Sequence, residues 1–122
     1  MPYQIELPYP PTVNTYWRNW NGRTVLAKRG RQYKQAVQAA VGIQPPRLSG
    51  PLCLMASVWL PDRRRRDLDN ILKPLLDALT SAGVWDDDSQ VKALQIAHVG
   101  IQKPGCVQIQ VSQMEVADVP SL

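Results

Sequence analysis

The chain has 122 residues, a formal net charge of +4 and a hydrophobic fraction of 44%, which predict one domain with its own core. It contains no run of 18 apolar residues, so no membrane helix is predicted. The start, MPYQIELPYPP, lacks the basic and apolar regions of a secretory signal. We therefore expect a cytoplasmic protein with a single domain over residues 1–114 and a flexible tail at residues 115–122.

The first half of the chain is predicted to contain a strand, a helix and a second strand. Weak alternation over residues 3–7 predicts a short strand, which ends in prolines because proline lacks the amide donor of a strand ladder. Apolar side chains recur at helical spacing from about Lys28 within residues 24–41, and Gly42 supplies a C-terminal stop. Residues 52–60 show little alternation, which predicts a central strand buried on both faces.

An irregular segment, residues 12–22, is predicted between the first strand and the first helix, with a turn at Asn21-Gly22. In and beside this segment lie three aromatic residues and two arginines, namely Tyr16, Trp17, Trp20, Arg18 and Arg23. Exposed aromatic rings beside arginines can stack on bases and contact phosphates. Alternatively, these rings pack a long loop against the core, and the sequence leaves both interpretations open.

The clearest predicted element is the helix after the arginines at residues 63–66, whose apolar face runs over residues 68–79 and whose end is capped by Gly83. Its leucines and isoleucine recur at i, i+3 and i+4 and form one apolar face. Pro74 would destabilise the interior of a helix by about 3 kcal/mol. We therefore expect the N-cap of the helix near Asp69 or Asn70, with the proline in its first turn.

The last two predicted strands cover residues 91–101 and 106–114, with a turn at residues 103–105 between them. The second strand alternates apolar and polar residues, and we expect the two to pair as a hairpin. The resulting order, β-α-β-α-β-β, predicts an α+β fold. Its architecture would be a two-layer sandwich of a mixed sheet with about four strands and two helices.

Charge is concentrated in residues 62–91, which hold seven of the ten acidic residues and five of the fourteen basic ones. The sequence there places four arginines directly before two aspartates and then adds a second acidic group: Arg63, Arg64, Arg65, Arg66, Asp67, Asp69, and then Asp86, Asp87 and Asp88. Like charges at this density are unfavourable unless they are neutralised. A divalent cation would neutralise the acids and a polyanion the arginines, which predicts a phosphodiester-processing site.

The spacing of the aspartates indicates a site for a hard cation. Asp67 and Asp69 are two residues apart at a strand-to-helix turn, where their side chains can converge. Asp87 and Asp88 precede the next strand, and a sheet that set both segments side by side would bring three carboxylates together. Three oxygen ligands with open positions describe a Mg²⁺ site that a substrate phosphate completes.

Basic residues complete the predicted site. Lys73 would stabilise negative charge on the reacting phosphate or the leaving oxygen, and the four arginines would hold flanking phosphates. The sequence offers no Ser-His-Asp set and no glycine-rich phosphate loop. Metal-assisted hydrolysis is therefore the simplest chemistry.

Several motifs occur in one order along residues 3–114. They are LPYPPTVNTYWR near the start, DRRRRDLDN at residues 62–70, Lys73, DAL at residues 77–79, and WDDDSQV at residues 85–91. Together they resemble the RusA family of Holliday-junction resolvases. The resemblance implies an endonuclease from bacteria or their prophages that acts in DNA recombination and repair.

The resemblance also implies an activity and site residues. The activity is Mg²⁺-dependent cleavage of four-way DNA junctions by a homodimer, with Mn²⁺ able to substitute and no small-molecule cofactor. The implied catalytic residues are Asp67, Asp69, Asp88 and Lys73. The implied metal ligands are Asp67, Asp69 and Asp88, with Asp87 assisting. The expected DNA-binding residues are Arg63, Arg64, Arg65, Arg66, Lys73, Arg18 and Arg23.

Two other functions remain open on the sequence alone. In one, the chain is a non-catalytic nucleic-acid-binding module, whose binding would be sensitive to salt and indifferent to the aspartates. In the other, it is a structural domain whose acidic residues only cap loops and bind no metal.

Overall fold

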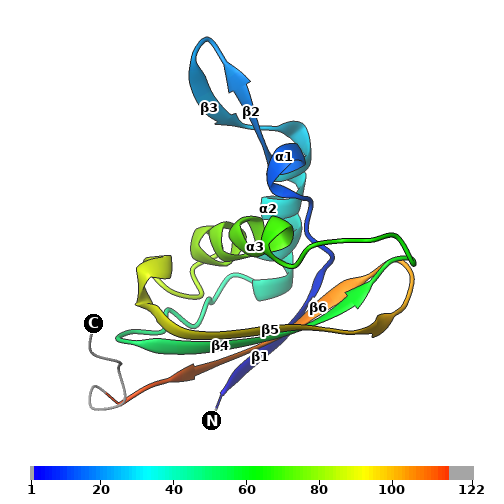
Figure 1. The fold of residues 1–122 in the computed structure, drawn as a ribbon. Coiled ribbons are helices and arrows are strands. Elements are labelled where there is room, and N and C mark those ends of the chain that lie inside the picture. The colour runs from blue at the N-terminus through cyan, green and yellow to red at the C-terminus, as the bar shows by residue number, and fades with distance from the viewer. Residues whose placement is uncertain (1, 116–122) are drawn as a thin grey trace.

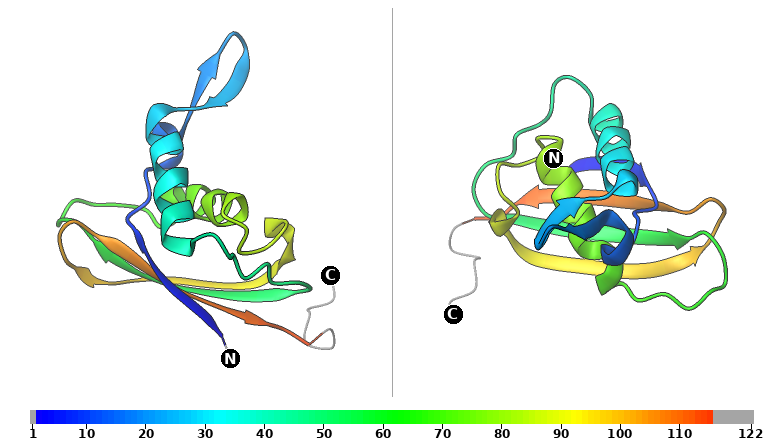
Figure 2. Two further views of the ribbon diagram at one scale, coloured as in Figure 1. Left: turned by 180° about the vertical axis from the view of Figure 1, so that it is seen from behind. Right: turned by 90° about the horizontal axis from the view of Figure 1, so that it is seen from above.

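The computed structural model describes residues 2–115, which form a sheet with both long helices on one face (Figures 1 and 2). The order of strands in the sheet is β1 (Tyr3–Pro8), β6 (Cys106–Gln113), β4 (Leu52–Leu60) and β5 (Val91–Ile101). The long helices are α2 (Lys28–Val41) and α3 (Asp69–Ser81). This confirms the predicted α+β class and the mixed four-stranded sheet. The predicted tail lies outside the described residues except for Glu115.

Strand β4 is the centre of the sheet, as its composition predicts. It pairs in parallel with β5 and antiparallel with β6. Its residues that face the helices, such as Leu54 and Val58, are fully buried, but Met55 on the other face is 43% exposed. The prediction of burial on both faces is therefore wrong for the outer face, because both helices cover the same side (Figure 1).

Strands β5 and β6 do not form the predicted hairpin. They flank β4 on opposite sides, so the chain between them crosses the end of β4. The crossing covers two strand spacings, about 10 Å, which the residues at 102–105 can span. The Gln102 amide donates a hydrogen bond to the Leu60 carbonyl at 2.8 Å, which fixes this turn to the end of β4. Local alternation predicted both strands but carries no information on their partners.

Helix α3 has its N-cap at Leu68, one or two residues before the predicted position, and therefore holds its proline deeper than expected. Pro74 is the sixth helical residue and lies in the second turn, so the prediction of a first-turn proline is wrong. The early turn is tightened by hydrogen bonds from the amides of Asn70 and Ile71 to residues three positions back. Pro74 is buried, as are Ile71 and Leu75, and this apolar burial offsets the missing amide hydrogen bond.

The segment predicted to be irregular is ordered. It contains the short helix α1 (Val13–Tyr16) and an antiparallel hairpin of β2 (Trp17–Trp20) and β3 (Arg23–Leu26). Asn21 and Gly22 at the tip both have positive φ, at 51° and 75°, which a tight two-residue hairpin turn requires. The hairpin extends away from the sheet and helices (Figure 1).

The core lies between the sheet and the two long helices. Its largest buried side chains are Trp85, Tyr16, Leu7, Leu52, Leu54, Ile71, Leu75 and Leu79. Tyr16 therefore belongs to the core, as one of the two interpretations of the aromatic segment proposed, whereas Trp20 is 55% exposed. No helix in the described part of the chain is long and apolar enough to cross a membrane.

Candidate metal and nucleic-acid site

Two carboxylates stand at the start of α3. Asp67 precedes the helix and Asp69 is its first residue, and both are exposed. The ion pairs formed within residues 2–115 involve Asp62 and Asp77 instead. Both carboxylates are therefore available to an external cation.

The arginine run forms a loop whose shape depends on Asp62. The Asp62 carboxylate accepts two hydrogen bonds from the Arg66 guanidinium, one at 3.2 Å, and a third from the Arg64 amide at 2.9 Å. These hydrogen bonds, the one from Arg66 above all, lower the pKa of Asp62 to about 2. Arg66 also lies 5.7 Å from the centre of the Tyr9 ring. Arg66 is thus held within the fold, whereas Arg63, Arg64 and Arg65 are exposed.

A basic pocket adjoins Asp67. It has a volume of about 270 Å³ and is lined by Tyr9, Thr12, Arg64, Arg65, Arg66, Asp67, Asn70 and Ile71. A second pocket of about 530 Å³ shares Tyr9, Thr12 and Arg66 with it and adds Arg29 and Gln32 from α2. The two pockets place cationic side chains on a surface that leads to a carboxylate, an arrangement suited to a phosphodiester chain.

Lys73 lies one turn into α3 from Asp69 and is held by an aromatic ring. Its ammonium lies 5.4 Å from the centre of the Trp17 ring. Tyr16, the residue before Trp17, donates a hydrogen bond from its hydroxyl to the Asp77 carboxylate at 2.5 Å. Asp77 also pairs with Lys34 of α2 at 3.4 Å. These contacts fix α1 to both long helices, and burial, together with the Asp77 carboxylate, raises the pKa of Tyr16.

The second acidic segment is fixed by capping. Asp87 caps the short 3₁₀ helix η1 (Asp88–Gln90), and its carboxylate accepts a hydrogen bond from the Ser89 amide at 2.9 Å, which lowers the pKa of Asp87. The Gln90 side chain accepts from the amides of Asp86 and Asp87 at 3.0 Å each. It also donates to the carbonyl of Leu48 at 3.0 Å. Asp88 is exposed at the start of η1, which these hydrogen bonds hold in place.

The two acidic segments lie at opposite ends of α3 (Figure 1). Asp67 and Asp69 follow β4, whereas Asp88 precedes β5. Because these two strands are parallel, the two acidic segments lie at opposite ends of the strands. At 1.5 Å per residue, the ends of this helix are roughly 20 Å apart. Within residues 2–115, no group of three His, Cys, Asp or Glu side chains could hold a metal ion. The expected side-by-side arrangement is therefore not formed within one chain.

The predicted DNA-binding arginines of the hairpin are exposed near its tip. The Arg18 guanidinium lies 5.4 Å from the centre of the Trp20 ring, and Arg23 is the strand partner of Trp20. Trp20 and these two arginines therefore share one end of the projecting hairpin, where they are accessible to a large ligand.

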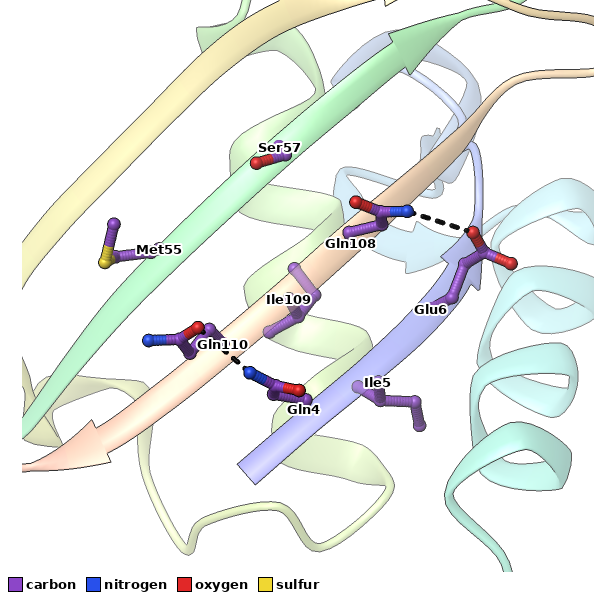
Figure 3. Close-up of a pocket in the computed structure, with 8 residues that line it drawn as sticks. All are labelled: Gln4, Ile5, Glu6, Met55, Ser57, Gln108, Ile109 and Gln110. Atoms are coloured by element: carbon purple, nitrogen blue, oxygen red, sulfur yellow. Dashed lines mark hydrogen bonds between the residues drawn. The ribbon is translucent and has the colours of Figure 1, made fainter. Parts of the chain in front are cut away.

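The outer face of the sheet has a different character. A pocket of about 510 Å³ on this face is lined by Gln4, Ile5, Glu6, Met55, Ser57, Gln108, Ile109 and Gln110 (Figure 3). Its one charged residue is the acid Glu6, and Gln4 and Gln110 are hydrogen-bonded to each other at 3.1 Å. This face is unsuited to a polyanion, so the basic surface on the helix side is the candidate nucleic-acid interface.

Comparison with known proteins identifies the family. The family profile described as Endodeoxyribonuclease RusA matches residues 8–112. The chain belongs to the RusA family. This confirms the resemblance seen in the sequence motifs, and the matched region includes the hairpin, the arginine loop and both acidic segments.

Individual RusA proteins match nearly the whole chain. Those of Shigella sonnei (strain Ss046) and Escherichia coli (strain K12), both named crossover junction endodeoxyribonuclease RusA, are 37% identical over 114 residues. The match covers 92% of this chain and 95% of each relative. The protein of the same name from Enterobacteria phage HK97 is 40% identical over 107 residues, or 84% of this chain and 87% of that protein.

Sequence reasoning missed one basic group of this RusA-family chain. Lys28, Arg29 and Arg31 occupy the start of α2, whose first turn has no acidic residue. Cations are unfavourable at that end of a helix because the macrodipole is positive there. A cluster of basic residues at a helix N-terminus is therefore a signal for an anionic ligand, and it could have identified Arg29 as part of the site.

Proposed function

We propose that this chain is a Mg²⁺-dependent crossover junction endodeoxyribonuclease that acts on four-way DNA junctions in the cytoplasm as a homodimer, with Mn²⁺ able to replace Mg²⁺. The observation that carries the proposal is the pocket in which Asp67 lies beside Arg64 and Arg65. This pocket places a carboxylate beside side chains that can bind phosphate, at the start of α3. The family to which the chain belongs supports DNA hydrolysis as the chemistry.

Asp67 and Asp69 fit a hard cation. Both offer exposed carboxylate oxygens, and Mg²⁺ is commonly held by one or two carboxylates together with water and substrate phosphates. Bound there, Mg²⁺ would supply activation of the attacking water and stabilisation of the negative charge at phosphorus. Lys73 supplies a second positive charge one helical turn away.

We infer that Asp88 completes the site from the second copy of the chain. Asp87 is engaged in capping η1, whereas the carboxylates of Asp86 and Asp88 are exposed and form no ion pair within the described residues. We assign the ligand role to Asp88, the residue that the resemblance to the family implies. If a two-fold axis crosses β5, the β5 strands of the two copies run in opposite directions. The acidic turn at residues 86–88 of one copy then approaches the C-terminal end of β5 in the other copy, which lies near that copy's arginine loop. The negative turn and the positive loop complement each other in charge.

Strand β5 has the properties of a contact surface between copies. It is an edge strand of 11 residues. Three of its apolar side chains are exposed, namely Leu94 at 43%, Val99 at 46% and Ile101 at 51%. A long apolar edge readily pairs with another chain. Symmetric cleavage of two opposed strands also requires two sites, which a closed dimer supplies.

Phosphates of the junction would be held by basic residues on the helix side of the sheet. Arg63, Arg64 and Arg65 flank the carboxylates, and Arg29 extends the basic surface along α2. Arg18 and Arg23 would contact a DNA arm from the hairpin. Phosphate contacts of this kind position DNA without reading its sequence, so they suit a ligand recognised by its shape.

The test is cleavage of a synthetic four-way junction and of a linear duplex with the same sequence, with and without Mg²⁺. We expect paired nicks in the junction with Mg²⁺, none without it, and little cleavage of the duplex. Binding to the junction without metal should persist and weaken with salt. Junction binding without cleavage in Mg²⁺ or Mn²⁺ would favour the non-catalytic module.

A further inference from the structure

We propose that Trp17 is the positioning residue for Lys73, and that its ring holds the Lys73 ammonium at the reacting phosphate. This inference rests on the proposed function, because it assumes that Lys73 acts in DNA cleavage. It gives Trp17 a role different from both interpretations of the sequence, which were stacking on bases and packing of a loop against the core.

The position of the Trp17 ring is set by a rigid support. Tyr16, the neighbouring residue, is fully buried, and its hydroxyl is hydrogen-bonded to Asp77 on the same helix as Lys73. The Tyr16 and Trp17 rings meet edge to face with centroids 4.3 Å apart. The Ala27 amide also donates to the Tyr16 carbonyl at 2.8 Å. The contacts of Tyr16 with Asp77 and with Ala27 therefore fix the position of Trp17 relative to α3.

Close packing on α2 adds to this support. A Cβ atom at Gly30 would lie 2.3 Å from the Tyr16 carbonyl oxygen, so only glycine permits this approach of α1 to α2. Gly30 is buried although it lies in the first turn of the helix. The backbone that carries Trp17 thus has little freedom to move away from Lys73.

Lys73 needs such a neighbour because it has no acidic partner within the described residues. A lysine side chain has four rotatable bonds and is mobile when exposed. The face of a tryptophan ring attracts an ammonium and limits these conformations without neutralising its charge. An acidic partner would pair with the ammonium, whereas the ring leaves its charge available to a phosphate.

The test is a double-mutant cycle between Trp17→Leu and Lys73→Met, measured as single-turnover junction cleavage in Mg²⁺ and as junction binding without metal. We expect Trp17→Leu to slow cleavage roughly three- to thirtyfold and to leave binding unchanged. Trp17→Phe, which keeps a ring face, should recover most of the rate. In the Lys73→Met background, Trp17→Leu should cause no further loss. Equal losses in both backgrounds, or a loss confined to binding, would overturn the proposal.

A measurement on the wild-type protein keeps the proposal testable if Trp17→Leu does not fold. Ring currents should shift the side-chain methylene protons of Lys73 upfield relative to those of Lys103, which is exposed in the turn at residues 102–105. Absence of that shift would also overturn the proposal. If Lys73→Met cleaves at the wild-type rate, the role assigned to Lys73 under the proposed function is wrong. That result is distinct from the results above, which would refute only the role of Trp17.

Discussion

Replacing Asp69 with Asn is expected to slow junction cleavage roughly a thousandfold or more, because a bound cation contributes several kcal/mol at the transition state. Junction binding without metal should stay within about twofold of wild type, since phosphate contacts provide most of the affinity. The measurements are single-turnover cleavage in Mg²⁺ and a binding titration without metal. The substitution is isosteric at an exposed residue, so stability should change little.

Glu6→Gln is the matched control for this prediction. It removes one carboxylate from the outer face of the sheet (Figure 3), and Glu6 lines neither of the basic pockets. We expect it to cleave at the wild-type rate. If Asp69→Asn also cleaved at that rate, the assignment of Asp69 as a metal ligand would be wrong.

Replacing Lys73 with Met is expected to slow cleavage roughly a hundredfold, which is typical for the loss of one group that stabilises transition-state charge. Methionine is unbranched like lysine and only one atom shorter, so the substitution mainly removes the positive charge. Junction affinity should fall only slightly, because one phosphate contact among several is lost. The measurements are again the single-turnover rate and the binding constant, here at several salt concentrations.

Lys103→Met is the control for the loss of one positive charge. Lys103 is exposed in the turn between β5 and β6 and lines none of the basic pockets described above. A similar decrease in cleavage for both variants would mean that net charge, rather than the position of Lys73, determines the rate.

The sequence predicted the elements whose pattern is local. The apolar face of α3 follows from leucines at helical spacing, and α2 ends at Gly42 as expected. The strong apolar character of β4 correctly predicted its central place. The exposed carboxylates and arginines were also evident, because charge so dense on a short segment is unfavourable unless a ligand or solvent neutralises it.

Features that depend on distant partners could not be predicted in this way. The residues of β5 and β6 fit a hairpin equally well, and only the crossover through α3 makes β5 parallel to β4. That direction separates Asp88 from Asp69, which spacing along the chain cannot reveal. The β2–β3 hairpin was missed for another reason. Its strands have only four residues each, and half of those residues are polar, so only the turn at Asn21-Gly22 was recognised.

The sharing of the metal site between two copies is the claim on which the proposed mechanism depends. It is tested most directly by mixing the inactive variants Asp69→Asn and Asp88→Asn under conditions that allow subunits to exchange. If the carboxylates of one site come from both copies, each mixed dimer contains one intact site. With half of the dimers mixed, about one quarter of the wild-type nicking rate should return. A mixture that contains mixed dimers but remains as inactive as either variant alone would contradict the shared site.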